Sequence, residues 1–194
     1  MKNKKYTVLA VAAVLMSLVG CSSTSSATST VIYYADYPYY ASMEQLAQQA
    51  DMVIRGTMLS SRVESRDDSY TPNTTDPVAN PGGTAKPDPV VYTIYTFKIS
   101  DCYKGCDTPG TTVDVKQLGG VLENVTYSAS EVPFKVNKKY ILFLATFDSS
   151  PAELLNPVEA AYAGDPDSSG AYGSADPGST WKIAPGQLKK LFGK

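Results

Sequence analysis

Hydrophobic and polar residues alternate along much of the chain with the period of a half-buried β-strand. The alternation is clearest from Val90 to Gly120, where two such runs flank a turn with two cysteines. A further strand is expected from Met52 to Val63, and Gly56 inside it indicates a bulge or sharp bend. The continuous apolar run from Tyr140 to Phe147 predicts a central strand covered on both faces. The pattern therefore predicts a mainly β protein.

Short helices are expected on either side of the strands. Ser42 and Gln45 have the spacing of a capping box, and apolar residues follow at helical spacing as far as Ala50. One or two closing helical turns are expected over residues 187–192. Short strands with two peripheral helices predict a small, curled antiparallel β-barrel or sandwich.

The N-terminus has the parts of a secretory signal. A lysine-rich start precedes an apolar run, Tyr6 to Val19, that is short of the about 20 residues needed to span a bilayer. The run ends in Leu-Val-Gly-Cys, Leu18 to Cys21, which resembles the bacterial lipobox. That resemblance implies cleavage before Cys21 and acylation of its thiol, and acyl chains anchor a protein stably when there are two or more. The alternative is an ordinary signal peptide followed by an unrelated cysteine.

The chain is therefore expected to have three parts. These are a lipoprotein signal peptide (1–20), a lipidated flexible tether (21–41), and a single β-barrel domain (42–194) with mobile loops at about 66–89 and 164–179. The first loop is rich in proline and has strands on both sides, so it is not a domain boundary. Tyrosines cluster between residues 33 and 40; an extended segment packing its rings on the domain is favoured over an aromatic platform for a glycan or peptide.

Composition removes several classes of function. Acidic residues outnumber Lys and Arg by 19 to 17. Loss of the signal peptide would remove lysines but no acidic residue. The mature chain is therefore acidic, and nucleic acid is not an expected partner. Histidine is absent, which excludes Ser-His-Asp and Cys-His nucleophiles, histidine-ligated zinc and histidine acid–base chemistry. Neither a cofactor nor a metal ion is expected.

Five short motifs occur in order along the mature chain. They are Ala50–Gly56, Tyr92–Lys98, Lys104–Gly105, Gln117–Gly120 and Tyr140–Leu144. Together they resemble uncharacterised bacterial surface proteins with OB-fold barrels of the netrin-module type, a class that includes the tissue inhibitors of metalloproteinases. The resemblance implies a mainly β, small antiparallel OB-like β-barrel. Those inhibitors bind the zinc of their target through an N-terminal cysteine, but Cys21 would be acylated, so inhibition is not implied.

Cys102 and Cys106 flank a Tyr-Lys-Gly turn. In an exported protein this spacing favours a structural disulfide, provided that the strand ends bring the Cα atoms within about 4.4–6.8 Å. Two free thiols are the alternative. A redox pair is disfavoured because such pairs usually have C-x-x-C spacing at the start of a helix.

The segment from Asp165 to Asp176 matches part of the calcium-loop template, with acids at positions 1, 3 and 12 and glycine at position 6. The last ligand position holds Asp instead of Glu, and prolines crowd the loop, so a solvated acidic loop is favoured. Other acids lie near strands, but their spacing singles out no pair for glycosidase chemistry. They are Asp51, Asp101, Asp114, Glu123 and Glu131.

The favoured function is a non-enzymatic binding domain, lipid-anchored at the extracytoplasmic face of a bacterial membrane. Its partner would be a protein, peptide or glycan. A protease-inhibitor-like module is one alternative, on fold analogy alone. A hydrolase that uses paired carboxylates is the other.

Overall fold

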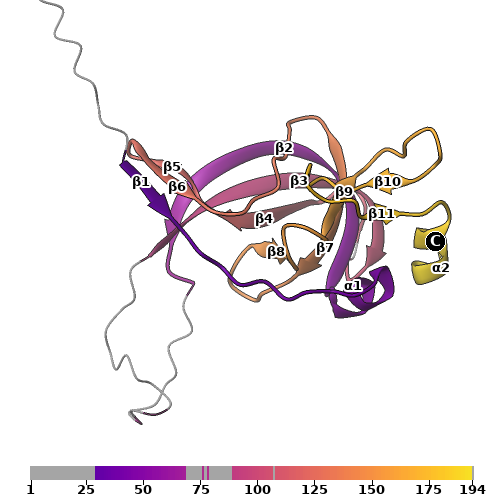
Figure 1. The fold of residues 1–194 in the computed structure, drawn as a ribbon, viewed down its shortest axis with the longest axis horizontal. Coiled ribbons are helices and arrows are strands. Elements are labelled where there is room, and N and C mark those ends of the chain that lie inside the picture. The colour runs from indigo at the N-terminus through magenta and orange to yellow at the C-terminus, as the bar shows by residue number, and fades with distance from the viewer. Residues whose placement is uncertain (1–28, 69–75, 77, 79–88, 107, 194) are drawn as a thin grey trace, which may run out of the picture.

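The computed structural model describes residues 29–68, 76, 78, 89–106 and 108–193 (Figure 1). The predicted signal peptide, Cys21 and most of the proline-rich loop lie outside the described residues. Within the described part, no helix is long and apolar enough to cross a membrane.

The described chain is mainly β. Its strands are β1 (Ser29–Ile32), β2 (Met52–Arg66), β3 (Val90–Lys104), β4 (Thr112–Leu118), β5 (Gly120–Leu122), β6 (Val125–Ser128), β7 (Lys139–Ala145), β8 (Ala152–Leu154), β9 (Ala161–Ala163), β10 (Tyr172–Gly173) and β11 (Lys182–Ile183). Its helices are α1 (Met43–Gln49), which the capping and apolar patterns predict, and α2 (Gln187–Phe192), where one or two helical turns are expected.

Five strands pair in a ring. Strands β2, β3 and β4 are antiparallel neighbours, and β7 returns to pair with the free side of β2. This is the Greek-key order. The short strand β8 completes the ring, antiparallel to β7 and parallel to β4. The prediction of antiparallel strands is therefore correct for most pairs, but β4–β8 and β1–β6 are parallel.

Strand β2 bends so that it can serve two neighbours. Its register with β3 shifts between Arg55 and Gly56, where the sequence predicts a bulge. A Cβ at Gly56 would lie 3.1 Å from the carbonyl oxygen of Lys98, tighter than ordinary contact. The absence of a side chain therefore lets β2 and β3 approach closely at the bend.

The core follows the predicted strand faces. Alternate residues of β3 are buried, and they are Val91, Thr93, Tyr95, Phe97 and Ile99. Ile94, expected on the other face, is also fully buried. All side chains of β7 from Tyr140 to Leu144 are buried, as the continuous apolar run predicts.

A cap fixes the start of α1. Ser42 Oγ accepts a hydrogen bond from the Gln45 amide at 3.2 Å, and the Gln45 side chain accepts one from the Ala41 amide at 2.9 Å. The predicted capping pair is thus present, with the return bond one residue earlier than in the standard box.

The folded part starts earlier than residue 42. Residues 29–41, predicted to belong to the flexible tether, form β1 and an extended segment that runs along the ring to α1 (Figure 1). We call residues 33–41 the arm. Its Tyr40 is buried, and Tyr33 stacks on Tyr127 with ring centroids 5.8 Å apart. The predicted tether is too long because its tyrosines pack on the domain.

Strands β1, β6 and β5 form a separate small sheet in that order, which we call the outer sheet. The sequence predicts one weak strand over residues 121–128, whereas the structure has the hairpin β5–β6. Glu123 and Asn124 have φ values of 50° and 65°, the left-handed conformation that a two-residue hairpin turn requires. The outer sheet lies at the end of the molecule opposite α2 (Figure 1).

Candidate functional site

The arm is fastened to the ring by a polar turn that follows β8. The Asn156 side-chain oxygen accepts hydrogen bonds from the amides of Val158 and Glu159, at 3.1 and 2.6 Å. Its side-chain nitrogen donates to the Pro38 carbonyl at 2.9 Å and to Glu159 Oε2 at 2.6 Å. The same carboxylate oxygen accepts from the Tyr40 amide at 3.0 Å. Asn156 therefore orders the turn and holds the arm against it.

Both polar side chains of this junction are buried. Asn156 and Glu159 are each 4% exposed. A buried carboxylate is tolerated only when hydrogen bonds compensate its lost hydration. Burial of the Tyr40 phenol raises its pKa, and the nearby charge of Glu159 raises it further. The junction is a compact anchor in which the Asn156 side chain and Glu159 Oε2 bond within the protein.

An aromatic groove of about 460 Å³ lies above this junction. Its lining is rich in aromatic and proline side chains, and consists of Tyr37, Pro38, Tyr39, Ser130, Asn156, Pro157, Val158, Glu159 and Trp181. The arm forms one wall, and Trp181, just before β11, belongs to the other part of the lining. Tyr39 is 76% exposed, so a ligand can reach its ring. Such volumes and linings are typical of ligand sites.

The wall that carries Trp181 is held by its neighbours. Ile183, two residues on, is fully buried, and the Trp181 carbonyl accepts a hydrogen bond from the Ser174 amide at 2.9 Å. The Trp181 ring packs on the edge of the hydrophobic core. It is the only tryptophan in the sequence, which makes its fluorescence a direct report on the groove.

The tyrosine cluster divides between the two roles considered for it. Tyr33 and Tyr40 pack on the domain, Tyr37 and Tyr39 line the groove, and Tyr34 is 92% exposed outside it. The packing interpretation therefore fits Tyr33 and Tyr40, while Tyr37 and Tyr39 remain on the surface that a ligand would touch.

A second hollow, about 510 Å³, lies beside the C-terminal helix. It is slightly larger than the groove, but Tyr103 and Asp101 in its lining already have partners within the protein. The Tyr103 ring packs against Phe192 with centroids 5.8 Å apart. Asp101 accepts a hydrogen bond from Ser100 at 2.9 Å and pairs with Arg55 at 3.7 Å. The groove, which has an exposed aromatic ring, is the better candidate for binding.

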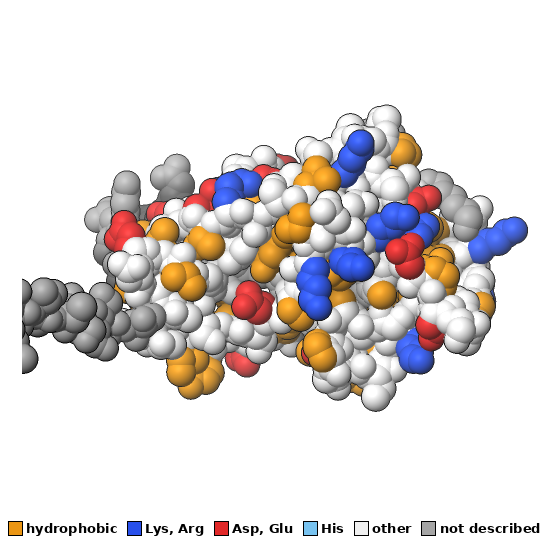
Figure 2. All heavy atoms as spheres, turned by 90° about the horizontal axis from the view of Figure 1, so that it is seen from above, with side chains coloured by type: hydrophobic (Ala, Val, Ile, Leu, Met, Phe, Trp, Pro, Cys, Tyr) orange, Lys and Arg blue, Asp and Glu red, His pale blue; other side chains and the backbone are white. Residues whose placement is uncertain are grey.

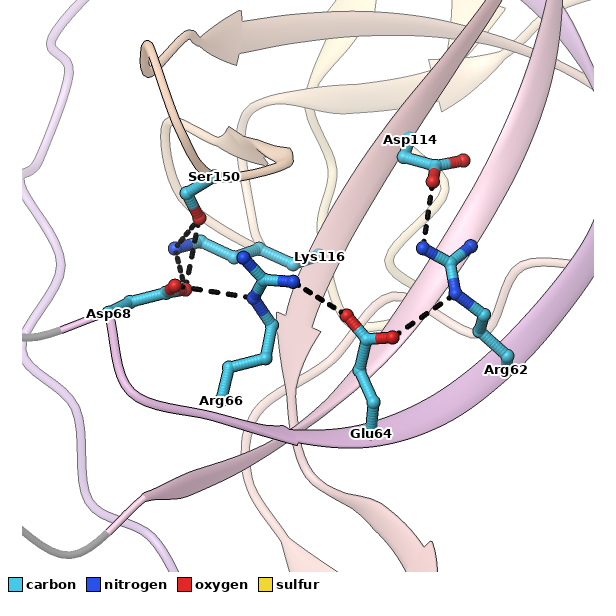
Figure 3. A network of polar contacts seen from close by, with 7 residues as sticks. All are labelled: Arg62, Glu64, Arg66, Asp68, Asp114, Lys116 and Ser150. Atoms are coloured by element: carbon cyan, nitrogen blue, oxygen red, sulfur yellow. Dashed lines mark hydrogen bonds and ion pairs between the residues drawn. The ribbon is translucent and has the colours of Figure 1, made fainter.

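A charged network runs from β2 to the loop after β7 (Figure 3). It consists of Arg62, Glu64, Arg66, Asp68, Asp114, Lys116 and Ser150. The three β2 residues alternate along the strand and therefore share one face. Arg66 links Glu64, at 2.8 Å, to Asp68, at 3.2 Å. At one end of the network, the Arg62 side chain is about half exposed, so its ion pairs contribute little to folding stability. At the other end, the Lys116 side chain is buried.

Lys116 is the centre of the buried end. Its side chain is 6% exposed, and Nζ lies 2.7 Å from Asp68 Oδ2 and 2.9 Å from Ser150 Oγ. The ammonium group also lies about 5 Å from the ring centroids of Tyr92 and Phe147, 5.1 and 4.9 Å respectively. Cation–π attraction is strongest in such desolvated positions.

The two acids beside Lys116 have opposite pKa shifts. Burial works to raise the pKa of Asp68, but hydrogen bonds from Lys116 and Ser150 and nearby positive charges outweigh it, so the pKa is lowered. Burial raises the pKa of Glu153, which lies 3.8 Å from Lys116 Nζ. The Lys116 charge lowers this pKa and the Asp68 charge raises it, and the net shift is upward. Opposite shifts are typical of acid–base pairs. The crevice that Lys116 and Glu153 line has a volume of only about 10 Å³, enough for one water and no substrate.

Ser150 and Lys116 have the spacing of a nucleophile and its base. However, Asp68 Oδ2 contacts both groups, at 3.0 Å from Ser150 Oγ and 2.7 Å from Lys116 Nζ. Lys116 is thus the cationic partner of Asp68, and an ammonium group has no lone pair with which to accept a proton. The geometry therefore fits a structural ion pair better than a Ser-Lys dyad.

Cys102 and Cys106 are joined by a disulfide, with Cα atoms 5.9 Å apart. The turn between them packs on the junction of α1 and β2. Lys104 Nζ donates to the carbonyls of Ala47 and Gln48, each at 3.0 Å, at the C-terminal end of α1. Gly105 has φ +68°, and a Cβ there would collide with a backbone carbonyl oxygen. The cysteines therefore belong to a turn that fixes α1.

The acids of the calcium-like loop point to separate partners. Asp165 pairs with Arg55 at 3.0 Å, while Asp167 Oδ1 accepts from the amides of Ser169 and Ala171 at 2.8 and 3.1 Å. Asp176 Oδ1 accepts from the Gly178 amide at 3.0 Å. Across the described residues, no three His, Cys, Asp or Glu side chains gather closely enough to hold a metal ion. The loop, predicted to be loose, contains β10 and ordered turns.

Comparison with protein-family models and with curated proteins found no match to this chain. The resemblance to netrin-type modules stays a prediction. Function is therefore inferred from the geometry of this chain alone.

Proposed function

We propose that this chain is a lipid-anchored, extracytoplasmic binding protein whose domain is an OB-like β-barrel. The ring β2-β3-β4-β8-β7, which returns to β2, supports a barrel because a closed sheet leaves no unpaired edge. A Greek-key order of five strands is the arrangement of the OB-fold. Membership of that fold is an inference from strand order.

The ligand we propose for the aromatic groove is an extended, proline-rich peptide segment of a partner protein. The observation that carries this proposal is the exposed aromatic and proline lining above an Asn156 side chain and a Glu159 Oε2 atom that bond within the protein. Sugar recognition needs free donors and acceptors, but Asn156 and the Glu159 Oε2 atom bond within the protein. Proline-rich segments need mainly aromatic faces, and their preformed extended backbone loses little entropy on binding.

Titration of a synthetic polyproline peptide is expected to change Trp181 fluorescence saturably. Replacing Tyr39 by Ala should weaken binding by about three- to tenfold, the loss expected for one aromatic contact. Tyr34→Ala is the matched control, because this tyrosine is exposed but lies outside the groove. Its affinity should equal that of the wild type.

Two results would contradict the proposed ligand. Equal affinities for the Tyr39→Ala and Tyr34→Ala variants would place binding elsewhere. Saturable binding of a chito-oligosaccharide instead of polyproline, with loss in Tyr39→Ala, would reassign the groove to glycans. Comparison of the Tyr39→Ala and Tyr34→Ala variants distinguishes both results from a general loss of folding, because the two substitutions are chemically the same.

The anchor rests on Leu18–Cys21, which lies outside the described residues. Mass spectrometry of the mature protein is expected to show a chain that begins at acylated Cys21 and fractionates with membranes. A Cys21→Ala variant should accumulate without acyl chains and without cleavage at this position. If that variant is cleaved at the same bond and sediments like the wild type, the anchor is wrong.

A further inference from the structure

The outer sheet exposes apolar side chains on a face that no other described element covers. Ile32 is 59% exposed and Val121 is 61% exposed. Register places both on one face, because Ile32 is opposite Ser128, Val121 is opposite Thr126, and residues 126 and 128 lie on the same side of β6. The face is thus made of β-branched and small side chains.

This sheet is also poor in charge. The residues of its strands and of the turn between β5 and β6 include a single charged residue, Glu123. On the face drawn in Figure 2, the end from which the grey chain leaves has orange and red side chains but no blue ones. Lysine and arginine side chains lie farther from that end, at the upper left, over the centre and at the opposite end. Apolar contact, not attraction between opposite charges, is what this surface offers.

The position of the sheet identifies what could cover it. Strand β1 begins at Ser29, eight residues after the proposed acylation site at Cys21. Eight residues reach at most about 29 Å even when fully extended. An acylated Cys21 would therefore hold the outer sheet within that distance of the lipid headgroups, with α2 at the far end of the molecule.

We propose that the outer sheet docks on the lipid surface, with Ile32 and Val121 entering the boundary between headgroups and acyl chains. Apolar side chains stabilise such contacts by leaving water, and a tether makes the contact intramolecular. The contact fixes the orientation of the domain, so that the outer sheet faces the bilayer. This inference rests on the proposed lipid anchor.

The test uses the acylated protein purified from membranes and reconstituted in phosphatidylcholine vesicles. A spin label is attached to Ser128→Cys on the outer-sheet face, and in a second sample to Thr180→Cys, two residues before β11. Both native residues are exposed. The label at 128 should be several-fold more accessible to oxygen, relative to a soluble nickel chelate, than the label at 180. In an Ile32→Ser, Val121→Ser background, the label at 128 should become as accessible to nickel as the label at 180.

Equal accessibility of the two labels in the wild-type background would overturn the proposal. So would shielding of position 128 from both reagents with spin–spin broadening, because that result means pairing with a second copy. Failure of the anchor itself is distinguishable, since a protein without acyl chains would not float with the vesicles and would lack the acyl mass. Flotation and mass are therefore measured before the spectra.

Discussion

An Asn156→Asp variant is expected to lose about 3 kcal/mol of folding stability at neutral pH, the cost of a buried charge without compensation. The change is nearly isosteric, but it replaces the amide nitrogen that lies 2.6 Å from Glu159 Oε2 with a carboxylate oxygen. It also removes the donor to the Pro38 carbonyl. The arm should therefore detach, which hydrogen exchange at the Tyr40 amide would report.

The loss should depend on pH. Two carboxylates in contact cannot both ionise easily, so the pKa of the pair is raised above the unfolded values of about 4. Because the pKa of the pair is higher in the folded variant than in the unfolded chain, the variant keeps its stability below the unfolded pKa. It loses stability as the pH rises through the folded-state pKa. Urea unfolding should show a deficit against the wild type that is largest at neutral pH and shrinks on acidification.

Asn137→Asp is the matched control, because Asn137 is exposed and tolerates Asp at its φ of 62°. Its stability should change little. Adding Glu159→Gln to Asn156→Asp should recover part of the stability by removing one of the two charges. A pH-independent deficit, or no recovery in the double variant, would show that charge repulsion is not the cause.

A Lys116→Met variant is expected to lose about 3 kcal/mol, because it leaves the little-exposed carboxylate of Asp68 without its closest cation. Lys116 and Asp68 side chains are only 6% and 14% exposed, so solvent screens their attraction little. The methionine also loses the cation–π contacts with Tyr92 and Phe147. Urea or thermal unfolding of the purified variant measures the loss.

This deficit should change with pH in the same direction as that of Asn156→Asp, but through a lowered pKa in the wild type instead of a raised pKa in the variant. The wild-type pKa of Asp68 is lowered, so its contribution is present above the unfolded pKa of about 3.9 and is lost as pH falls through the folded pKa. The deficit of Lys116→Met should therefore be full at neutral pH and shrink in acid. Lys139→Met is the control, since Lys139 is 45% exposed and lies 3.7 Å from Asp165. It should cost less than about 1 kcal/mol. Equal losses in the two variants would refute the role of burial.

Local patterns predicted the elements whose own residues determine them. Period-two alternation located β3, and a continuous apolar run located β7, because burial on one or both faces leaves that mark in the sequence. The closed pairing of the five strands has no such pattern in the sequence. Strand β8 has three residues, and its parallel pairing with β4 depends on the chain that surrounds it.

The groove was only partly predictable. The tyrosine cluster marked one wall, but nothing near Trp181 indicated that it lies across from the arm. The Asn156-Pro157 dipeptide is a turn signal. It could have located the turn, yet not its bond to Pro38, since that contact joins residues more than a hundred positions apart. Lys116 likewise reads as an exposed alternate residue of β4, and only the three-dimensional arrangement shows its burial.

The pairing of β2 with β7 has a consequence for biosynthesis. It joins Met52 to Leu144, and closing so long a loop is an entropic cost paid before the contacts form. At about 5–20 residues per second, translation reaches Leu144 roughly 5–18 s after Met52. During that time one edge of β2 has no partner, and unpaired edges promote aggregation. Chaperones that cover the β2 edge should therefore raise the yield of folded protein.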